Sequence, residues 1–260
     1  MALTLTEARE VVEAERRECV AERDAFERFR TAVTRADAGG GASMTGTSTF
    51  GVGAGPTAAR GVPGVETSAR GVTGTSLRRS YRRHVMAAGG GTDESLSDHV
   101  AAELGPDLAA VVCRGTLTPA TRRGLLDRVD IAVDARESFV ALLDRERASL
   151  DAVEAVCRRV RSEGRRTRTW ESTSRGADAP LGAALTAWDR LDDLAAALDE
   201  GARDRQETLA RHRRSFAVVD DDVTGYLYGC RPGLAAIASV GEDLSAARRA
   251  VVRAVGGGAR

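Results

Sequence analysis

Apolar residues recur at alternating spacings of three and four along residues 119–163, which is the pattern of one face of a long helix. Arg136 and Glu146 interrupt this seam. Thr118 and Pro119 predict the helix start, and Gly164 predicts its end. At about 1.5 Å per residue the helix would reach about 67 Å, so we expect partner helices to cover part of it. The apolar seam positions are Leu125, Val129, Ala132, Phe139, Leu143, Leu150, Val153, Cys157 and Val160.

A second helix is predicted over residues 4–35, where Thr4 and Glu7 have the spacing of a capping box. Its apolar stripe is narrow because Glu15 and Glu22 occupy the companion seam position. The helix therefore needs a partner, and we expect it to dock on its own chain rather than on a second copy. The heptad positions are Leu5, Val12, Cys19, Phe26 and Val33.

Two more long helices are predicted over residues 181–216 and 233–255, and shorter ones between residues 77 and 112. The 17 residues from Gly164 to Pro180 are predicted to form a loop, and the two long helices that it joins should fold back antiparallel. The face predicted for 181–216 holds Leu181, Ala184, Trp188, Leu191, Ala195, Leu198, Ala202, Leu209 and Phe216. The face predicted for 233–255 holds Leu234, Ile237, Leu244, Val251 and Val255.

Residues 36–76 are rich in Gly, Ala, Thr, Ser and Val and have no period, which predicts a flexible linker. The predicted organisation is an N-terminal helix over 1–35, this linker, a helical bundle over 77–255 and a disordered tail over 256–260. The fold class is all-α, as an elongated, antiparallel, coiled-coil-like helical bundle.

Composition gives no overall attraction to an anionic partner, because 38 basic and 38 acidic residues leave a formal net charge of zero. Hydrophobic residues make up 42% of the chain but aromatic residues only 4%, which favours thin helical layers. The N-terminus lacks the features of a secretory signal, and no apolar run is long enough to span a membrane. We therefore expect a cytoplasmic protein with no membrane partner. The cysteines form no Cys-x-x-Cys pair, so free thiols are expected at Cys19, Cys113, Cys157 and Cys230.

Candidate chemistry is sparse. His84, His99 and His212 fall in different elements, which disfavours a zinc site and favours surface or interface histidines. The acidic run 220–222 lacks the spaced ligands and turn glycine of a calcium loop. Phosphate-binding loops, nucleophile elbows and zinc-protease motifs are missing from the sequence. We predict no catalytic, cofactor-binding or metal-binding residue, no cofactor and no enzymatic activity; an enzyme with a site between helices is the least favoured alternative.

Arginine clusters are the strongest remaining signal, and with Trp170 they could contact phosphates and stack a base. The acidic stretch 189–207 opposes them, so intramolecular pairing or a solvated face is favoured. Tyr226 and Tyr228 are expected to pack across the end of the bundle with their hydroxyls at the rim. The predicted interaction surface comprises Arg78, Arg79, Arg82, Arg83, Arg165, Arg166, Arg168 and Trp170.

Several residue blocks along the chain resemble those of an uncharacterised haloarchaeal all-helical family, a domain of unknown function. They are Ala25–Phe29, Tyr81–Met86, Ala102–Leu108, Arg136–Phe139, Arg145–Leu150, Arg205–Gln206 and Tyr226–Tyr228. The resemblance covers nearly the whole chain except the linker. It implies a cytosolic helical protein and supplies no activity.

Two functions follow as expectations. The favoured one is a non-catalytic structural or protein-interaction module, with an unknown protein or a second copy as its partner. The alternative is a nucleic-acid-associated or regulatory helical protein that uses the arginine clusters. Specific, base-reading nucleic-acid binding is not expected, because no groove-reading module is present in the sequence.

Overall fold

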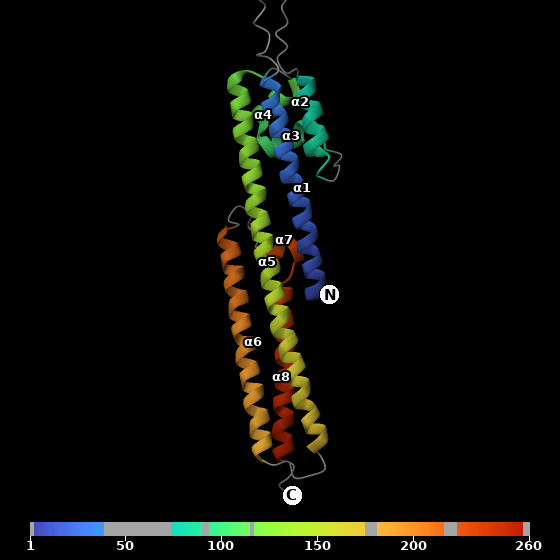
Figure 1. Ribbon diagram of the computed structural model, residues 1–260, viewed down its shortest axis with the longest axis vertical. Helices are drawn as coiled ribbons and strands as arrows, with labels where there is room; N and C mark the ends of the chain where they lie inside the picture. The colour runs from blue at the N-terminus through green and yellow to red at the C-terminus, as the bar shows by residue number, and fades with distance from the viewer. Residues whose placement is uncertain are drawn as a thin grey trace, which may run out of the picture. The chain divides into compact units, whose positions relative to one another are not determined.

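The computed structural model describes residues 3–38, 74–89, 94–114, 117–174, 181–215 and 223–256, and all regular structure in these ranges is helical (Figure 1). This confirms the all-α class. The elements are α1 (Leu5–Ala38), α2 (Gly74–Tyr81), the π-helical turn η1 (Arg82–Met86), α3 (Leu96–Leu104), α4 (Pro106–Arg114), α5 (Pro119–Ser174), α6 (Leu181–Ser215), α7 (Val223–Tyr228) and α8 (Pro232–Gly256).

The predicted linker 36–76 lies outside the described residues, except that its ends belong to α1 and α2. The predicted tail 256–260 also lies outside them beyond the last residue of α8. The chain divides into two compact units: unit 1 comprises Met1–Arg17 with Val140–Arg260, and unit 2 comprises Glu18–Phe139. Helices α1 and α5 therefore each contribute residues to both units.

The predicted starts of the helices α1 and α5 are confirmed. In α1, the backbone N–H of Thr4 donates to Glu7 Oε2 at 2.8 Å and that of Glu7 donates to Thr4 Oγ1 at 3.2 Å, which closes the capping box. Before α5, the N–H of Thr121 donates to Thr118 Oγ1 at 3.1 Å. Both hydroxyls accept from backbone donors that lack a partner within the helix.

The predicted end of α5 at Gly164 is wrong, because the helix continues to Ser174. A glycine in a helix interior costs only about 1 kcal/mol relative to alanine. Arg165 and Arg166, which follow it, are good helix formers. The hydroxyl of Thr167 also donates to the backbone carbonyl of Glu163 at 3.2 Å, across the glycine.

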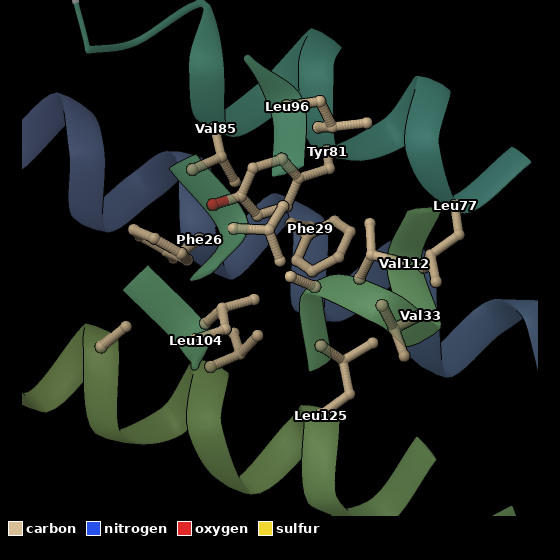
Figure 2. Close-up of a cluster of buried hydrophobic side chains, with 14 residues drawn as sticks. Phe26, Phe29, Val33, Leu77, Tyr81, Val85, Leu96, Leu104, Val112 and Leu125 are labelled. Atoms are coloured by element: carbon tan, nitrogen blue, oxygen red, sulfur yellow. The ribbon is translucent and has the colours of Figure 1, made fainter. Parts of the chain in front are cut away.

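The core of unit 2 gathers side chains of α1, α2, α3, α4, α5 and η1 (Figure 2). Phe29 of α1 and Tyr81 of α2 meet edge to face, with ring centroids 5.1 Å apart. The Tyr81 hydroxyl lies 2.9 Å from His99 Nδ1, and burial raises the pKa of this tyrosine. The buried members include Phe26, Phe29, Val33, Leu77, Tyr81, Val85, Leu96, Leu104, Val112 and Leu125.

The core of unit 1 lies among α5, α6 and α8, where α6 runs antiparallel to both of the other helices (Figure 1). This confirms the predicted antiparallel return of the chain after α5. The α5 seam is buried as predicted except for Phe139, which is half-buried. The core cluster of unit 1 contains Val153, Cys157, Val160, Ala184, Ala187, Leu191, Leu194, Leu198, Ile237, Val240, Leu244, Ala247 and Val251.

The predicted faces of α6 and α8 are wrong at three positions. Leu181 is 62% exposed, Trp188 38% and Val255 45%. The buried stripe of α6 instead passes through Ala187 and Leu194, so Leu181 and Trp188 fall at its edge.

Ion pairs join the first turns of α1 to α5 within unit 1. Arg9 Nε lies 2.8 Å from Asp151 Oδ1 and Arg16 Nε lies 2.6 Å from Asp144 Oδ1. Ala8, just before Arg9, and Val12, between the two arginines, are fully buried. Such partly exposed pairs stabilise by about 1 kcal/mol or less each, so burial of apolar side chains contributes more.

Candidate functional site

The predicted arginine surface on α2 and η1 consists of one half-buried and three exposed side chains. Arg78 is half-buried, and its Nη1 donates to the carbonyl of Cys113 on α4 at 2.6 Å. Arg79, Arg82 and Arg83 are exposed and, together with Arg78 and Thr75, line an open hollow. Within the described part of the chain, no ion pair is formed by these three guanidinium groups.

The second predicted cluster is only partly placed. Arg165 and Arg166 are exposed on α5, whereas the side chains of Arg168 and Trp170 lie outside the described residues. Nearby arginines pair along α5 itself, as Arg158 does with Glu154 at 2.8 Å. The predicted combination of phosphate contact and base stacking therefore lies partly outside the described side chains and stays a prediction.

A buried ion pair lies in unit 1. One of its members, Glu146, was visible in the sequence only as an interruption of the α5 seam. Glu146 of α5 and Arg205 of α6 both have fully buried side chains. Arg205 Nη1 donates to Glu146 Oε2 and Nη2 to Glu146 Oε1, each at 2.7 Å, and Nη1 also donates to Ser149 Oγ at 3.0 Å. This two-pronged geometry is the strongest form of the arginine–carboxylate contact.

Two more polar side chains close around Glu146. The hydroxyl of Tyr228 on α7 donates to Glu146 Oε1 at 3.2 Å, and burial raises the pKa of this tyrosine above its ordinary value. His212 is buried, with Nδ1 3.4 Å from Glu146 Oε2 but not aligned for a hydrogen bond. Burial lowers the pKa of His212, which outweighs the opposing effect of Glu146. The expectations of a surface or interface His212 and a rim hydroxyl on Tyr228 are both wrong.

Gly233 of α8 completes this cluster by leaving room for the guanidinium. A Cβ at position 233 would lie 3.0 Å from Arg205 Nε and 3.5 Å from its Cδ. The cluster therefore links α5, α6, α7 and the start of α8. The side chains of Glu146 and Arg205 are sealed from solvent inside it.

The other interruption of the α5 seam is also a centre of ion pairing, in unit 2. Arg136 Nη2 donates to both carboxylate oxygens of Glu103, at 2.9 and 2.8 Å, and its Nε donates to Glu22 at 3.2 Å. The guanidinium carbon lies 4.8 Å from the centroid of the Phe26 ring, which adds a cation–π contact. A charged residue inside an apolar seam was the signal for both clusters.

An exposed apolar groove lies between the first turns of α6 and the last turns of α8. It has a volume of about 350 Å³ and is lined by Leu181, Ala184, Leu185, Trp188, Val251, Val252 and Val255. Leu185 is 55% exposed and Val252 57%. The guanidinium of Arg248 on α8 stands 5.7 Å from the Trp188 ring centroid and pairs with Asp192. The groove was not predicted from the sequence, because the apolar spacing placed Leu181, Trp188 and Val255 in the core.

The structure also bears on metal binding, membrane spans and the state of the cysteines. In the described ranges, no group of three or more His, Cys, Asp or Glu side chains converges as a metal site. The acidic run 220–222 lies outside these ranges. None of the helices, as far as the structure describes them, combines the length and apolarity needed to cross a membrane. The four cysteines are free thiols, as predicted, and Cys19 and Cys157 are buried.

These features define an all-α protein with paired charges inside its helical layers and an apolar groove on its surface. The chain belongs to the family Domain of unknown function (DUF7260), which it matches over residues 3–248. This confirms the predicted membership of a family of unknown function that covers nearly the whole chain. No curated protein and no solved structure matches the chain.

Proposed function

We propose that the protein is a non-catalytic helical interaction module whose docking site is the groove between α6 and α8. The observation that carries this proposal is the gathering of large exposed apolar side chains around one hollow. Contiguous apolar patches on soluble domains mark binding surfaces far more often than isolated exposed side chains do. A groove between two antiparallel helices also matches the shape of an apolar helix face, which is a common recognition mode.

The apolar side chains of the groove would supply binding energy if a partner covered them. Trp188 and Leu185 offer large apolar areas on α6, and Val252 faces the same hollow from α8. Burying one such side chain stabilises a contact by roughly 1.5–3 kcal/mol before the costs of association are counted. Trp188 has the properties of a central anchor, because tryptophan dominates the binding energy of many interfaces.

Site-specific photo-cross-linking tests this function in cells of the source organism. A photoreactive phenylalanine analogue is placed at Leu185, in the groove, and at Ala152, an exposed position on α5, which does not line the groove. Irradiation should give a discrete adduct from position 185 and none from position 152, and mass spectrometry identifies the attached peptide. Equal or absent adducts at the two positions would contradict the proposal.

A second candidate function is sequence-independent association with nucleic-acid phosphates. It is favoured by the exposure of Arg79, Arg82 and Arg83 on neighbouring turns of α2 and η1, without ion pairs inside the described ranges. Such contacts release counterions, so their affinity falls steeply as salt rises. The triple change of these arginines to glutamine should remove salt-sensitive binding to a DNA duplex. Changing Arg78 alone should mainly reduce stability, because its guanidinium donates to the Cys113 carbonyl.

A cytoplasmic location accompanies the proposal. All four cysteines are free thiols, which suits a reducing compartment. The haloarchaeal source implied by the resemblance also stays a prediction.

A further inference from the structure

We propose that the groove is covered by the same groove of a second copy of this chain, which gives a symmetric homodimer. This inference rests on the docking role proposed above and names its partner. A two-fold contact joins a surface to itself, so the surface must be self-complementary in shape and charge. The groove meets both conditions.

The shape of the groove is self-complementary because α6 and α8, which form its two sides, run antiparallel (Figure 1). A two-fold axis parallel to these helices lays α6 of one copy on α8 of the other and keeps every residue at its own height. Each helix then has antiparallel neighbours on both sides. The product is an antiparallel four-helix arrangement, in which the apolar walls cover one another.

The charges beside the groove are also self-complementary under this symmetry. The contact between Trp188 on α6 and Arg248 on α8 places these two residues at the same level along the helix axes. The next residues, Asp189 on α6 and Arg249 on α8, are exposed at about this height. The proposed symmetry therefore brings Asp189 of each copy opposite Arg249 of the other. Opposite charges meet twice around one apolar centre, as an interface with an apolar core and a polar rim requires.

The chain segments next to the groove are poor alternatives as its cover. Residues 175–180 precede α6 and residues 257–260 follow α8 in the sequence. They contain only Arg, Gly, Ala, Asp and Pro, and therefore lack the large aliphatic or aromatic side chains that would fill an apolar hollow. The groove of a second copy provides such side chains.

Light scattering and sedimentation of the full chain measure the mass over about a hundredfold range of protein concentration. We expect a dimer that Leu185→Glu converts to a monomer, because the new carboxylate would be buried in the apolar contact. The matched control Ala152→Glu adds the same carboxylate at an exposed position of α5, a helix that does not line the groove, and should leave the dimer intact. Unchanged circular dichroism for both variants shows that folding is not the cause.

A charge-exchange series tests the arrangement itself. Asp189→Arg and Arg249→Asp each place two like-charged pairs at the contact, so each should raise the dissociation constant about five- to tenfold. The double variant restores opposite charges and should return the constant to near its original value. Asp204→Arg, an exposed change on α6 about 22 Å farther along the helix, should have no effect.

Three outcomes would overturn the homodimer: a monomer at every concentration, a dimer that is insensitive to Leu185→Glu, or a double charge variant that does not recover. The first outcome leaves the proposed function testable by itself. A cross-link from position 185 to a different protein would then retain the docking role and exclude self-association, whereas absence of that cross-link would remove both.

Discussion

Arg205 holds Glu146 through two hydrogen bonds of 2.7 Å, and both side chains are fully removed from solvent. Burying two charges is costly, and only close geometry with additional hydrogen bonds offsets that cost. Ser149 and Tyr228 supply such additional bonds. The pair therefore ties α5 to α6 in one register while contributing little net stability compared with an apolar pair of similar volume.

This relationship predicts a strongly non-additive mutant cycle. Glu146→Leu and Arg205→Met should each lower the free energy of unfolding by about 3–5 kcal/mol, because each leaves one buried charge without its partner. The double variant should lose much less than the sum of the two. Urea denaturation followed by circular dichroism measures all three variants, and additive losses would mean that the two side chains are not coupled.

Two glycines of α8, Gly233 and Gly241, should respond in opposite directions to substitution by alanine. A Cβ at Gly241 would meet Leu198 Cδ2 at 3.6 Å, an ordinary contact, so Gly241→Ala should stabilise by roughly 0.4–1 kcal/mol. A Cβ at Gly233 would instead press on Arg205 Nε at 3.0 Å, and the ion pair prevents that side chain from moving freely. Gly233→Ala should therefore lower the melting temperature, and a rise in both variants would contradict the close packing at Gly233.

The long helices were predictable from sequence because their apolar periods are local properties of the chain. The residues that cap α1 and α5 gave their starts to within a residue. The end of α5 was not predictable from Gly164, because good helix formers on its C-terminal side offset the cost of one glycine. Local propensity fixes where such a helix begins more reliably than where it ends.

The candidate site was less predictable because burial depends on the angle at which helices meet. Arg136 and Glu146 were visible as charges in an apolar seam, but their partners Glu103 and Arg205 lie on other elements. Trp188 reads as a core residue from spacing alone. Only the packed arrangement of α6 and α8 shows that it lies at the edge of the buried stripe and lines a groove.

Leu143 and Arg147 provide a matched comparison on neighbouring turns of α5. Leu143 is fully buried, so Leu143→Ala should lower the free energy of unfolding by roughly 2–5 kcal/mol. Arg147 pairs with Glu13 at 3.1 Å, but its side chain is 50% exposed, and Arg147→Ala should cost about 1 kcal/mol or less. Thermal or urea unfolding that gave the reverse order would show that the wrong face of α5 has been assigned to the core.

His212 should make the folded state sensitive to mild acid. Burial lowers the pKa of His212, with Arg205, Arg145 and Arg211 acting in the same direction and Glu146 opposing them. The folded protein therefore binds a proton at His212 less readily than the unfolded chain, whose histidine titrates near about pH 6.5. Above that pH both states are neutral and the residue adds no pH dependence. As pH falls below it, the unfolded chain gains the proton first, so the free energy of unfolding decreases.

We expect the loss of stability between about pH 7.5 and pH 5.5 to be larger in the native sequence than in His212→Gln, which has no proton to gain. The His84→Gln variant is the control for general effects of removing a histidine. Burial also lowers the pKa of His84, with Arg83 and Arg28 acting in the same direction, but this side chain is only partly covered and its contribution should be smaller. Urea denaturation at several pH values measures the three slopes. A native slope equal to that of His212→Gln would show that His212 takes up its proton in the folded state, as a partner of Glu146.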